Sequence, residues 1–349
     1  MAERVLVAMS GGVDSSVAAA RLVDEGHEVA GVTLKLWGGP SDSGCCSVAD
    51  VEDARRVAAQ LGIPHYVFNL TDAFERHVVD PYVDAHAHAR TPNPCVECNR
   101  AIKFGALFER MHALGFDALA TGHHARVVRT DRGPRLARGH DRAKDQSYVL
   151  YMLGRRHLER TRLPVGEMTK ADVRAEAARC GLRTATKAES MDVCFITRGD
   201  RLDFLAQRMP SRPRPGAIVD VDGAPIGQHD GAERFTIGQR RGTGVAAGER
   251  RFVVDVDATT ATVTMGRRED LLREAVELDD LVIDPSIDSP ARVVAQSRAH
   301  GDPVPARLQR GEGARATVEW ETPQSRVAPG QVVALYDGDL LVGGGIATG

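Results

Sequence analysis

The stretch that decides the fold is Arg4-Val-Leu-Val-Ala-Met9, followed directly by Ser10-Gly-Gly-Val-Asp-Ser15. The first six residues form a short apolar run, as expected of a strand buried on both faces of a parallel sheet. A helical pattern then extends from about Asp14 to Glu25 and ends at Gly26. A glycine-rich turn between a buried strand and a helix N-terminus can bind phosphate, because backbone N–H groups and the helix dipole point at the anion.

This turn differs from two common nucleotide-binding motifs. It lacks the Lys of the G-x-x-x-x-G-K-[ST] loop and the spacing of the G-x-G-x-x-G dinucleotide fingerprint. Asp14 places a carboxylate beside the expected phosphates, and Mg²⁺ prefers oxygen ligands of this kind. We therefore expect a phosphate site of another type. A plain glycine turn with an Asp helix cap is the alternative.

Strand–helix alternation continues through the first part of the chain. The pattern predicts strands over 28–37, 65–70 and 117–121, and helices over 51–61, 104–114 and 169–180. In the last of these helices Thr169 is expected to be the N-cap and Asp172 the third helical residue. Alternation at this spacing predicts an α/β fold with a doubly wound parallel sheet.

The pattern changes at the proline-rich stretch from Met209 to Gly216. Short alternating segments then predict strands over 217–221, 251–257, 260–265, 277–283, 316–320 and 332–336. Such segments, separated by Gly, Pro and Asp, are typical of small β-rich domains. We expect three domains: an N-terminal domain with the phosphate site over 1–208, a small central β-domain over 209–272, and a C-terminal β-barrel-like domain over 273–349.

Composition narrows the class of protein. The chain has 349 residues, 42% of them hydrophobic and 27% charged, with a net charge of −3, which is ordinary for a globular protein. No apolar run reaches the roughly 18 residues of a membrane-spanning helix, and we read no signal peptide, so we expect a cytoplasmic protein without a membrane partner.

Basic residues are unevenly distributed. Residues 121–215 carry 21 positive and 11 negative side chains, which favours a polyanionic partner; a solvated, Arg-rich surface is the alternative. Only five of the 45 basic residues are Lys, at positions 35, 103, 144, 170 and 187.

The six cysteines do not form the disulfide framework of a small secreted domain. In a cytosolic protein such thiols are more often catalytic or metal-binding. Cys180 lies on the apolar face of its predicted helix and is expected to be a small buried hydrophobe. No role is predicted for Cys45 and Cys46.

Several blocks along the whole chain resemble one known family. Ser10–Ser15 looks like the PP-loop of ATP pyrophosphatases, which cleave ATP between the α and β phosphates and adenylate a substrate oxygen. The other blocks, in one order, are similar to tRNA-specific 2-thiouridylases: Thr91–Pro94, Cys98–Phe104, Ala120–His124, Lys144–Tyr148, Ser190–Ile196, Phe235–Gly242 and Pro329–Gln331. The resemblance implies an adenine nucleotide α-hydrolase-like N-terminal fold and a tRNA-uridine 2-sulfurtransferase. It also implies ATP with Mg²⁺, tRNA, and a sulfur-donor or sulfur-relay protein.

The cysteines acquire roles from this resemblance. Replacement of a carbonyl oxygen by sulfur needs adenylation, which makes the oxygen a leaving group, and then a sulfur donor. A cysteine persulfide can carry the sulfur, and a second thiol can release it by closing a disulfide. The family assigns the nucleophile to Cys98 and the persulfide to Cys194, with a transient disulfide between them; Asp14 is the third catalytic residue.

The resemblance also implies two sets of binding residues. Those for ATP are Ala8, Met9, Ser10, Gly11, Gly12, Val13, Asp14, Ser15, Leu34 and Gly122. Those for tRNA are Asn93, Pro94 and Cys95, in a loop under the target base, together with His123, Lys144, Asp145, Gln146 and Gln331. The C-terminal domain is expected to contact tRNA, but Arg307-Leu308 stands where the family has Arg-Tyr, so no contact is carried over there.

Cys95 departs from the family pattern, which has Asp at this position. Cys95, Cys98 and Cys194 form a plausible three-thiolate set for a [4Fe–4S] cluster with one open iron, as in some related tRNA thiolases. We favour the persulfide and keep the cluster as an alternative.

Two other functions compete with thiolation. One is a PP-loop amide-forming ligase acting on a small molecule, which would have no use for Cys98 and Cys194. The other is a non-catalytic nucleotide or RNA-binding module, against which the intact Asp14 and both Ser residues of the loop argue.

Overall fold

The computed structural model describes most of the chain. The described residues are 2–37, 47–188, 193, 195–196, 201–209, 213–245, 250–299 and 301–349. Cys45, Cys46 and Cys194 lie outside them, so the role predicted for Cys194 rests on the sequence.

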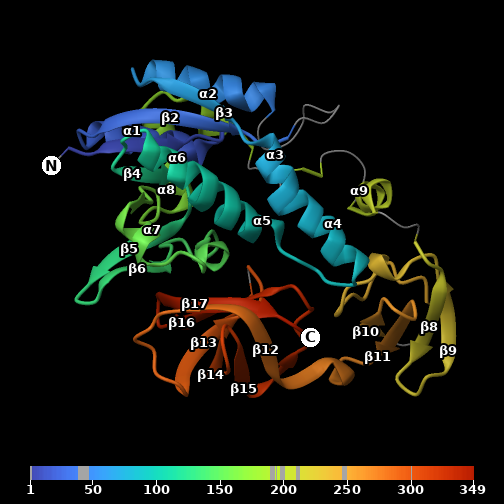
Figure 1. Cartoon of the computed structure of the whole chain (residues 1–349). Helices are drawn as coiled ribbons and strands as arrows, with labels where there is room; N and C mark the ends of the chain where they lie inside the picture. The colour runs from blue at the N-terminus through green and yellow to red at the C-terminus, as the bar shows by residue number, and fades with distance from the viewer. Residues whose placement is uncertain are drawn as a thin grey trace. The chain divides into compact units, whose positions relative to one another are not determined.

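The described chain divides into two compact units (Figure 1). The first comprises Met1–Val79, Pro94–Arg198 and Asp339–Val342, and the second comprises Asp80–Asn93, Gly199–Gly338 and Gly343–Gly349. The boundaries expected after residues 208 and 272 stay predictions. Among the helices of the described residues, none is both long and apolar enough to cross a membrane.

A five-stranded parallel sheet forms the centre of the first unit. Its strands are β1 (Arg4–Ala8), β2 (Glu28–Lys35), β3 (His65–Asn69), β4 (Ala118–Thr121) and β7 (Thr161–Arg162), in the order β3-β2-β1-β4-β7. The doubly wound parallel sheet expected from the sequence is confirmed. The order reverses direction at β1, and open parallel sheets bind ligands at such a reversal, beyond the carboxyl ends of the strands.

Three helices pack on one face of this sheet: α1 (Val13–Asp24), α2 (Val48–Gln60) and α8 (Lys170–Arg179). Val173 and Ala177 of α8 are fully buried in the shared core, as expected from their spacing. The capping box of α8 is also confirmed, because Thr169 and Asp172 exchange side-chain and backbone hydrogen bonds. Cys180, the C-cap residue, is only partly buried against the same core.

The helix expected over 104–114 begins ten residues earlier than predicted. The continuous helical segment consists of α5 (Pro94–Glu97), the wide π-turn η2 (Cys98–Ala106) and α6 (Leu107–Ala113). The loop expected at Asn93–Cys95 is therefore wrong for Pro94 and Cys95. Pro is tolerated at the first helical position, where its missing N–H costs nothing. The π-turn shifts the buried positions away from a 3.6-residue period, which hid the helix from periodicity.

The first unit contains further helices and strands. They are α3 (Thr71–Phe74), η1 (Glu75–Val79), β5 (Ala125–Thr130), β6 (Gly133–Arg138), η3 (Ser147–Leu150), α7 (Arg155–Glu159) and η4 (Arg183–Thr186). The antiparallel hairpin of β5 and β6 was not predicted, because arginines interrupt its apolar alternation.

The second unit contains two β-structures. A four-stranded sheet has the order β10-β11-β8-β9, with β8 (Gly216–Asp220), β9 (Pro225–His229), β10 (Phe252–Asp257) and β11 (Thr262–Gly266). Its core includes Ile218, Val253 and Val263. The helices of this unit are α4 (Asp80–Ala87), α9 (Arg201–Arg208), η5 (Ala232–Arg234) and η6 (Glu269–Leu271).

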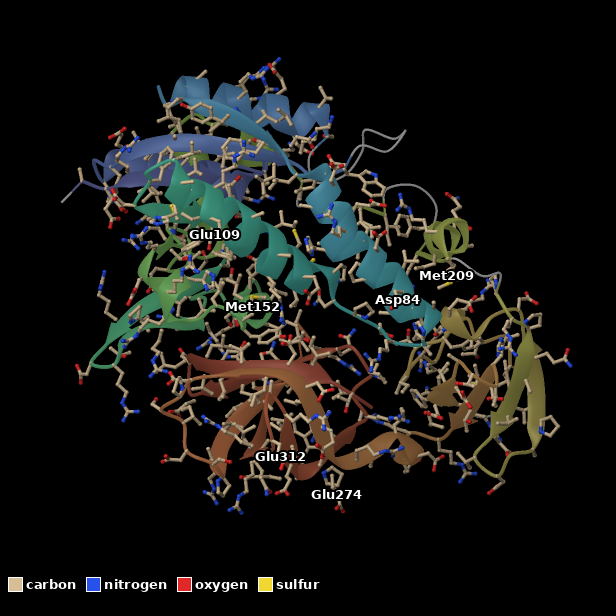
Figure 2. All side chains as sticks on the ribbon, in the orientation of Figure 1. Asp84, Glu109, Met152, Met209, Glu274 and Glu312 are labelled. Carbon is tan, nitrogen blue, oxygen red and sulfur yellow. The ribbon has the colours of Figure 1, made fainter. Side chains whose placement is uncertain are left out.

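A β-barrel follows η6. Its strands are β12 (Leu272–Ile283), β13 (Ala291–Gln296), β14 (Val304–Arg310), β15 (Ala316–Ser325), β16 (Val332–Asp337) and β17 (Leu340–Ala347). β12 pairs with both β15 and β17, which closes the barrel. Glu274 of β12 and Glu312, in the turn after β14, lie on its exposed side (Figure 2). The six predicted strands are found, but β9, β13, β14 and β17 were missed. Pro or Gly within β9, β14 and β17 resembles a turn, whereas β13 contains neither.

Candidate nucleotide-binding site

A cavity of about 340 Å³ lies in the first unit, at the carboxyl ends of β1 and β4. It gathers most of the predicted site residues from segments far apart in the sequence. Those that line it are Ala8, Met9, Ser10, Gly12, Val13, Asp14, Ser15, Leu34, Pro94, Cys95, Cys98, Gly122, His123, Lys144 and Gln146. The nucleotide set, Cys98 and part of the tRNA set therefore meet in one place.

The remaining predicted residues lie elsewhere. Asn93 and Gln331 belong to the second unit, where the Gln331 side-chain amide donates a hydrogen bond to the carbonyl of Thr91. Gly11, which is part of the loop, lies against the backbone of Asp50, and Asp145, between Lys144 and Gln146 in the chain, is buried.

The turn Ser10–Ser15 is held by its own hydroxyls. Ser15 Oγ accepts a hydrogen bond from the Ser10 backbone N–H at 3.1 Å, and Ser16 Oγ donates to the Gly12 carbonyl at 2.8 Å. Gly12 is the N-cap of α1 and supplies no side-chain cap, which leaves the first backbone N–H groups of the helix for a ligand. Asp14 is not the helix cap of the alternative interpretation, because its carboxylate contacts residues of other elements.

Gly122 is required at the end of β4 by a close approach. A Cβ atom at this position would lie 2.6 Å from the backbone nitrogen of Ser15 and 2.7 Å from the carbonyl carbon of Asp14. The chain after β4 can therefore pass against the start of α1 only where a residue has no side chain.

Asp14 is the centre of an ionic cluster on the cavity wall. Lys170 Nζ lies 2.7 Å from each carboxylate oxygen, and His124 Nε2 lies 3.1 Å from one of them. Burial alone would raise the pKa of Asp14, but the hydrogen bonds of His124 and Lys170 outweigh burial and lower the pKa below its ordinary value. Asp14 is therefore a carboxylate at neutral pH.

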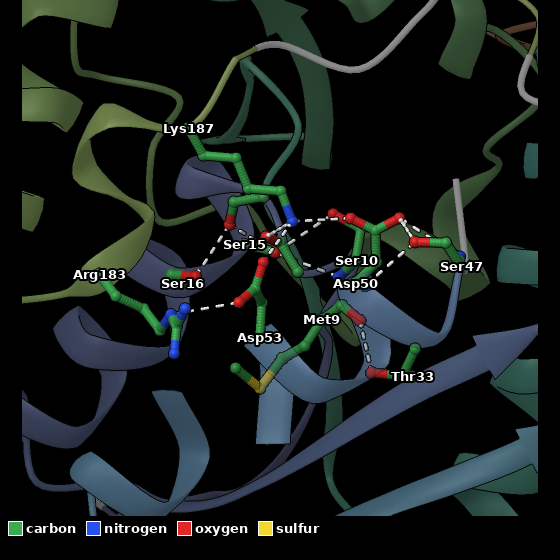
Figure 3. A network of polar contacts seen from close by, with 12 residues as sticks. Met9, Ser10, Ser15, Ser16, Thr33, Ser47, Asp50, Asp53, Arg183 and Lys187 are labelled. Atoms are coloured by element: carbon green, nitrogen blue, oxygen red, sulfur yellow. Dashed lines mark hydrogen bonds and ion pairs between the residues drawn. The ribbon is translucent and has the colours of Figure 1, made fainter. Parts of the chain in front are cut away.

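Four of the chain's five lysines lie at this site. Lys103, Lys144 and Lys170 line the cavity, and Lys187 contacts the backbone of the loop (Figure 3). Lys187 Nζ donates to the Gly11 carbonyl at 3.0 Å and to Asp50 and Asp53, each at 2.7 Å.

Lys187 thereby ties the loop to α2. Burial lowers the pKa of Lys187, but the two carboxylates outweigh it and raise the pKa above its ordinary value. Arg183 adds an ion pair to Asp53 at 3.2 Å. Sequence reasoning assigned no role to Lys103, Lys170 or Lys187, although the rarity of Lys in this chain was a usable signal.

Two cysteines line the cavity from the helical segment that begins at Pro94. Cys95 is half-buried and Cys98 is buried; residues three apart on a helix share one face. The amide nitrogen of Asn99 donates to the Val149 carbonyl at 3.0 Å and anchors this segment. Val193 and Phe195 also line the cavity, and the ring centroid of Phe195 lies 5.8 Å from that of Phe74.

The predicted tRNA block at 144–146 is anchored by its middle residue. The buried carboxylate of Asp145 accepts hydrogen bonds from Arg138 at 3.1 Å and from the Gly139 and Ser147 backbone N–H groups at 2.9 and 3.0 Å. Gln146 Oε1 accepts from the backbone N–H of His124 at 2.9 Å. Asp145 thus holds a loop from which its two neighbours line the cavity.

His123 is a buried residue of the cavity wall. Its Nδ1 lies 2.7 Å from the hydroxyl of Thr121, and its ring lies against Phe104. Burial lowers the pKa of His123 well below its ordinary value, so the ring is neutral at neutral pH.

Comparison with known proteins assigns the family. Residues 3–198 match the tRNA methyl transferase HUP domain, residues 202–267 the tRNA methyl transferase PRC-barrel domain, and residues 277–347 the aminomethyltransferase beta-barrel domain. The tRNA-specific 2-thiouridylase MnmA of Roseiflexus sp. (strain RS-1) is 46% identical over 98% of this chain and 98% of its own length. The protein of the same name from Chloroflexus aggregans (strain MD-66 / DSM 9485) is 48% identical over 98% of this chain and 97% of its own.

The chain belongs to the tRNA-specific 2-thiouridylase family. The domain names mention methyl transfer, but these full-length relatives are named thiouridylases, as expected from the sequence blocks. Among solved structures, a 4-thiouridine synthetase in complex with RNA and bound ATP is a remote match, with a TM-score of 0.39 and 18% identity over 60% of this chain and 50% of that chain.

In this 2-thiouridylase, Gly122→Ala should displace the start of α1. We expect a loss of about 1–3 kcal/mol of stability, because the new methyl group meets backbone atoms, and at least about a tenfold loss of ATP affinity. Thermal unfolding and calorimetric titration measure the two effects. The matched control is Gly154→Ala, where a Cβ meets no atom within 4 Å. ATP affinity in Gly122→Ala equal to that of the control would contradict the close-approach argument.

Proposed function

We propose that this chain adenylates the C2 oxygen of the wobble uridine of tRNA with ATP and replaces that oxygen by sulfur. The observation that carries the proposal is the single cavity lined by both the Ser10–Ser15 loop and Cys98. A ligase that joins a small molecule to an amine would need the loop but not the buried thiol. Because tRNA is the proposed substrate, we also propose that the enzyme acts in the cytoplasm.

The loop and the residues around it are suited to ATP binding and to adenylation of the uridine. Backbone N–H groups at the start of α1 and the hydroxyls of Ser10 and Ser15 would bind the phosphates, and Leu34 would contact the adenine through its backbone. Asp14 fits a role as Mg²⁺ ligand, because its carboxylate is ionised and lines the cavity. Bound there, Mg²⁺ would neutralise phosphate charge. Attack of the uridine oxygen on the α-phosphorus then expels pyrophosphate.

The cysteines would carry out the sulfur transfer. Cys194, outside the described residues, would carry the persulfide; its chain neighbours Val193 and Phe195 line the cavity. Attack of the Cys98 thiolate on the inner sulfur of the persulfide closes a disulfide and releases the terminal sulfur to C2, and AMP leaves with the original oxygen. A reductant then reopens the disulfide, and a sulfur-donor or sulfur-relay protein reloads Cys194.

The tRNA would enter beside the basic part of the first unit. Lys144 and Gln146 line the cavity on a loop anchored by Asp145, and we propose that Asp145 acts through this loop. Pro94, Cys95 and His123 line the cavity where the target base would lie. Asn93 and Gln331 are proposed contacts from the second unit.

Asp14→Asn should strongly slow ATP cleavage while tRNA binding persists. The amide keeps the shape of the side chain but cannot neutralise Mg²⁺, so tRNA-dependent pyrophosphate release should fall by about two orders of magnitude. A filter-binding assay should show tRNA affinity within about twofold of wild type. The control is Asp84→Asn, which removes an exposed carboxylate of α4 (Figure 2). Full thiolation by Asp14→Asn would overturn the role of the loop.

Cysteine variants separate the two sulfur chemistries. In the persulfide route, Cys98→Ser and Cys194→Ser abolish thiolation but keep adenylation, and only Cys98→Ser still loads sulfur on Cys194. Cys95→Ser keeps substantial activity in air, as does the control Cys180→Ser. Mass spectrometry of tRNA nucleosides and of the protein measures these outcomes. If Cys95→Ser is as inactive as Cys98→Ser, and wild type contains iron and labile sulfide, the [4Fe–4S] alternative holds instead.

Lys144→Ala should weaken tRNA binding with little change in ATP affinity measured without tRNA. Loss of one phosphate contact should flatten the slope of log affinity against log salt by about one unit. Titration of tRNA at several salt concentrations measures this slope, with Arg56→Ala on α2 as the control. A collapse of ATP affinity with unchanged tRNA binding would assign the loop to the nucleotide.

A further inference from the structure

The phosphate loop carries no cation of its own, yet an ammonium group from a distant part of the chain lies against it. The loop lacks the Lys of the G-x-x-x-x-G-K-[ST] motif. Lys170, 156 residues after Asp14, lines the same cavity and places Nζ 2.7 Å from both oxygens of the Asp14 carboxylate. Its side chain is 14% exposed.

We propose that Lys170 is a catalytic residue that exchanges partners: it pairs with Asp14 in the ligand-free protein and binds the pyrophosphate oxygens of ATP once Asp14 binds Mg²⁺. This inference rests on the proposed function and extends it to a residue outside the family blocks. Lys170 would thus supply from α8 the positive charge that the loop sequence lacks.

The backbone of Lys170 is fixed, so the exchange needs only side-chain rotation. Lys170 is the first residue of α8 and lies between Thr169 and Asp172, the two residues of the capping box. Its backbone N–H donates to the carboxylate of Asp141 at 3.0 Å, and Val173 one turn later is fully buried. A four-carbon side chain on such a rigid base can move its ammonium group by several ångströms between acceptors.

Charge explains why the exchange accompanies metal binding. Lys170 contacts both oxygens of Asp14, so a metal ion that binds this carboxylate would lie close to the ammonium and compete with it for the same oxygens. A divalent ion bound to Asp14 also repels the positively charged ammonium group of Lys170. The triphosphate of ATP, bound at the loop in the same cavity, would then offer acceptor oxygens to the ammonium. His124, at 3.1 Å, remains beside Asp14.

The new position has a use in the reaction. The bond between the α-phosphorus and its bridging oxygen breaks, and the electron pair stays on the departing pyrophosphate. An ammonium group beside that oxygen stabilises the developing negative charge more in the transition state than in bound ATP. Lys170 would therefore contribute to the cleavage rate as well as to binding.

Binding measurements without tRNA test the partner exchange. Lys170→Gln and Lys170→Arg are compared with Arg179→Gln, which removes one charge from the far end of α8, where Arg179 pairs with Glu176. Pyrophosphate, ATP and AMP are each titrated calorimetrically in Mg²⁺. We expect Lys170→Gln to weaken pyrophosphate and ATP by about tenfold or more and AMP by less than about twofold, with partial recovery in Lys170→Arg. Thermal unfolding confirms that each variant is folded.

A second measurement uses Mn²⁺ alone as the probe. Because Lys170 competes with the metal for Asp14, Lys170→Gln should bind Mn²⁺ several-fold more tightly than wild type, as measured by electron paramagnetic resonance. The added substitution Asp14→Asn should remove that gain. Unchanged Mn²⁺ affinity in Lys170→Gln would overturn the competition.

Three binding outcomes contradict the proposal. Lys170→Gln could bind pyrophosphate as wild type does, it could lose AMP affinity as much as pyrophosphate affinity, or wild type could bind no pyrophosphate. The proposed function is judged separately, by tRNA-dependent AMP formation. A chain that binds pyrophosphate through Lys170 but forms no AMP with tRNA would refute thiolation and leave the partner exchange intact.

Discussion

The interaction on which the site depends is the contact of Asp14 with Lys170 and His124. It joins the start of α1 to the end of β4 and the start of α8, so residues separated by 110 and 156 positions share one carboxylate. Two further constraints keep the same loop in place: Gly122 permits the backbone approach, and Lys187 donates a hydrogen bond to the Gly11 carbonyl. All three interactions involve the turn that follows β1, through either its backbone or the carboxylate of Asp14.

The second half of the site depends on helix geometry. Because Pro94 starts a helix and η2 is wide, Cys95 and Cys98 are presented from a rigid segment to the cavity that also contains the loop. Thiols on an ordered helix can be held at a reacting atom more accurately than thiols on a loop. Adenylation and sulfur transfer can then act on one base without its release.

Sequence reasoning succeeded where the signal is local. The strands β1 to β4, the helix ends at glycines and the capping box at Thr169 each follow from a few neighbouring residues. It failed at the segment from Pro94 to Ala106 because a π-turn has a different period, and at the β5–β6 hairpin because its arginines hide the alternation. Among the site residues, Lys170 and Lys187 were missed because no short motif contains them, and Lys103 was given no role although it lies inside the Cys98–Phe104 block.

By itself the sequence determined the parallel sheet, the phosphate-binding turn, the two cysteine blocks and the family, since each can be recognised from residues that are neighbours in the chain. Only the tertiary structure decided which cations meet the turn and which predicted residues share the cavity. The tertiary structure also shows that the carboxylate of Asp145 is buried, where it accepts hydrogen bonds from Arg138, Gly139 and Ser147. The physical reason is that these ion pairs and close backbone contacts form between elements that only the folded sheet brings together. Their partners are far apart in the sequence, so neither a short motif nor hydrophobic periodicity identifies them.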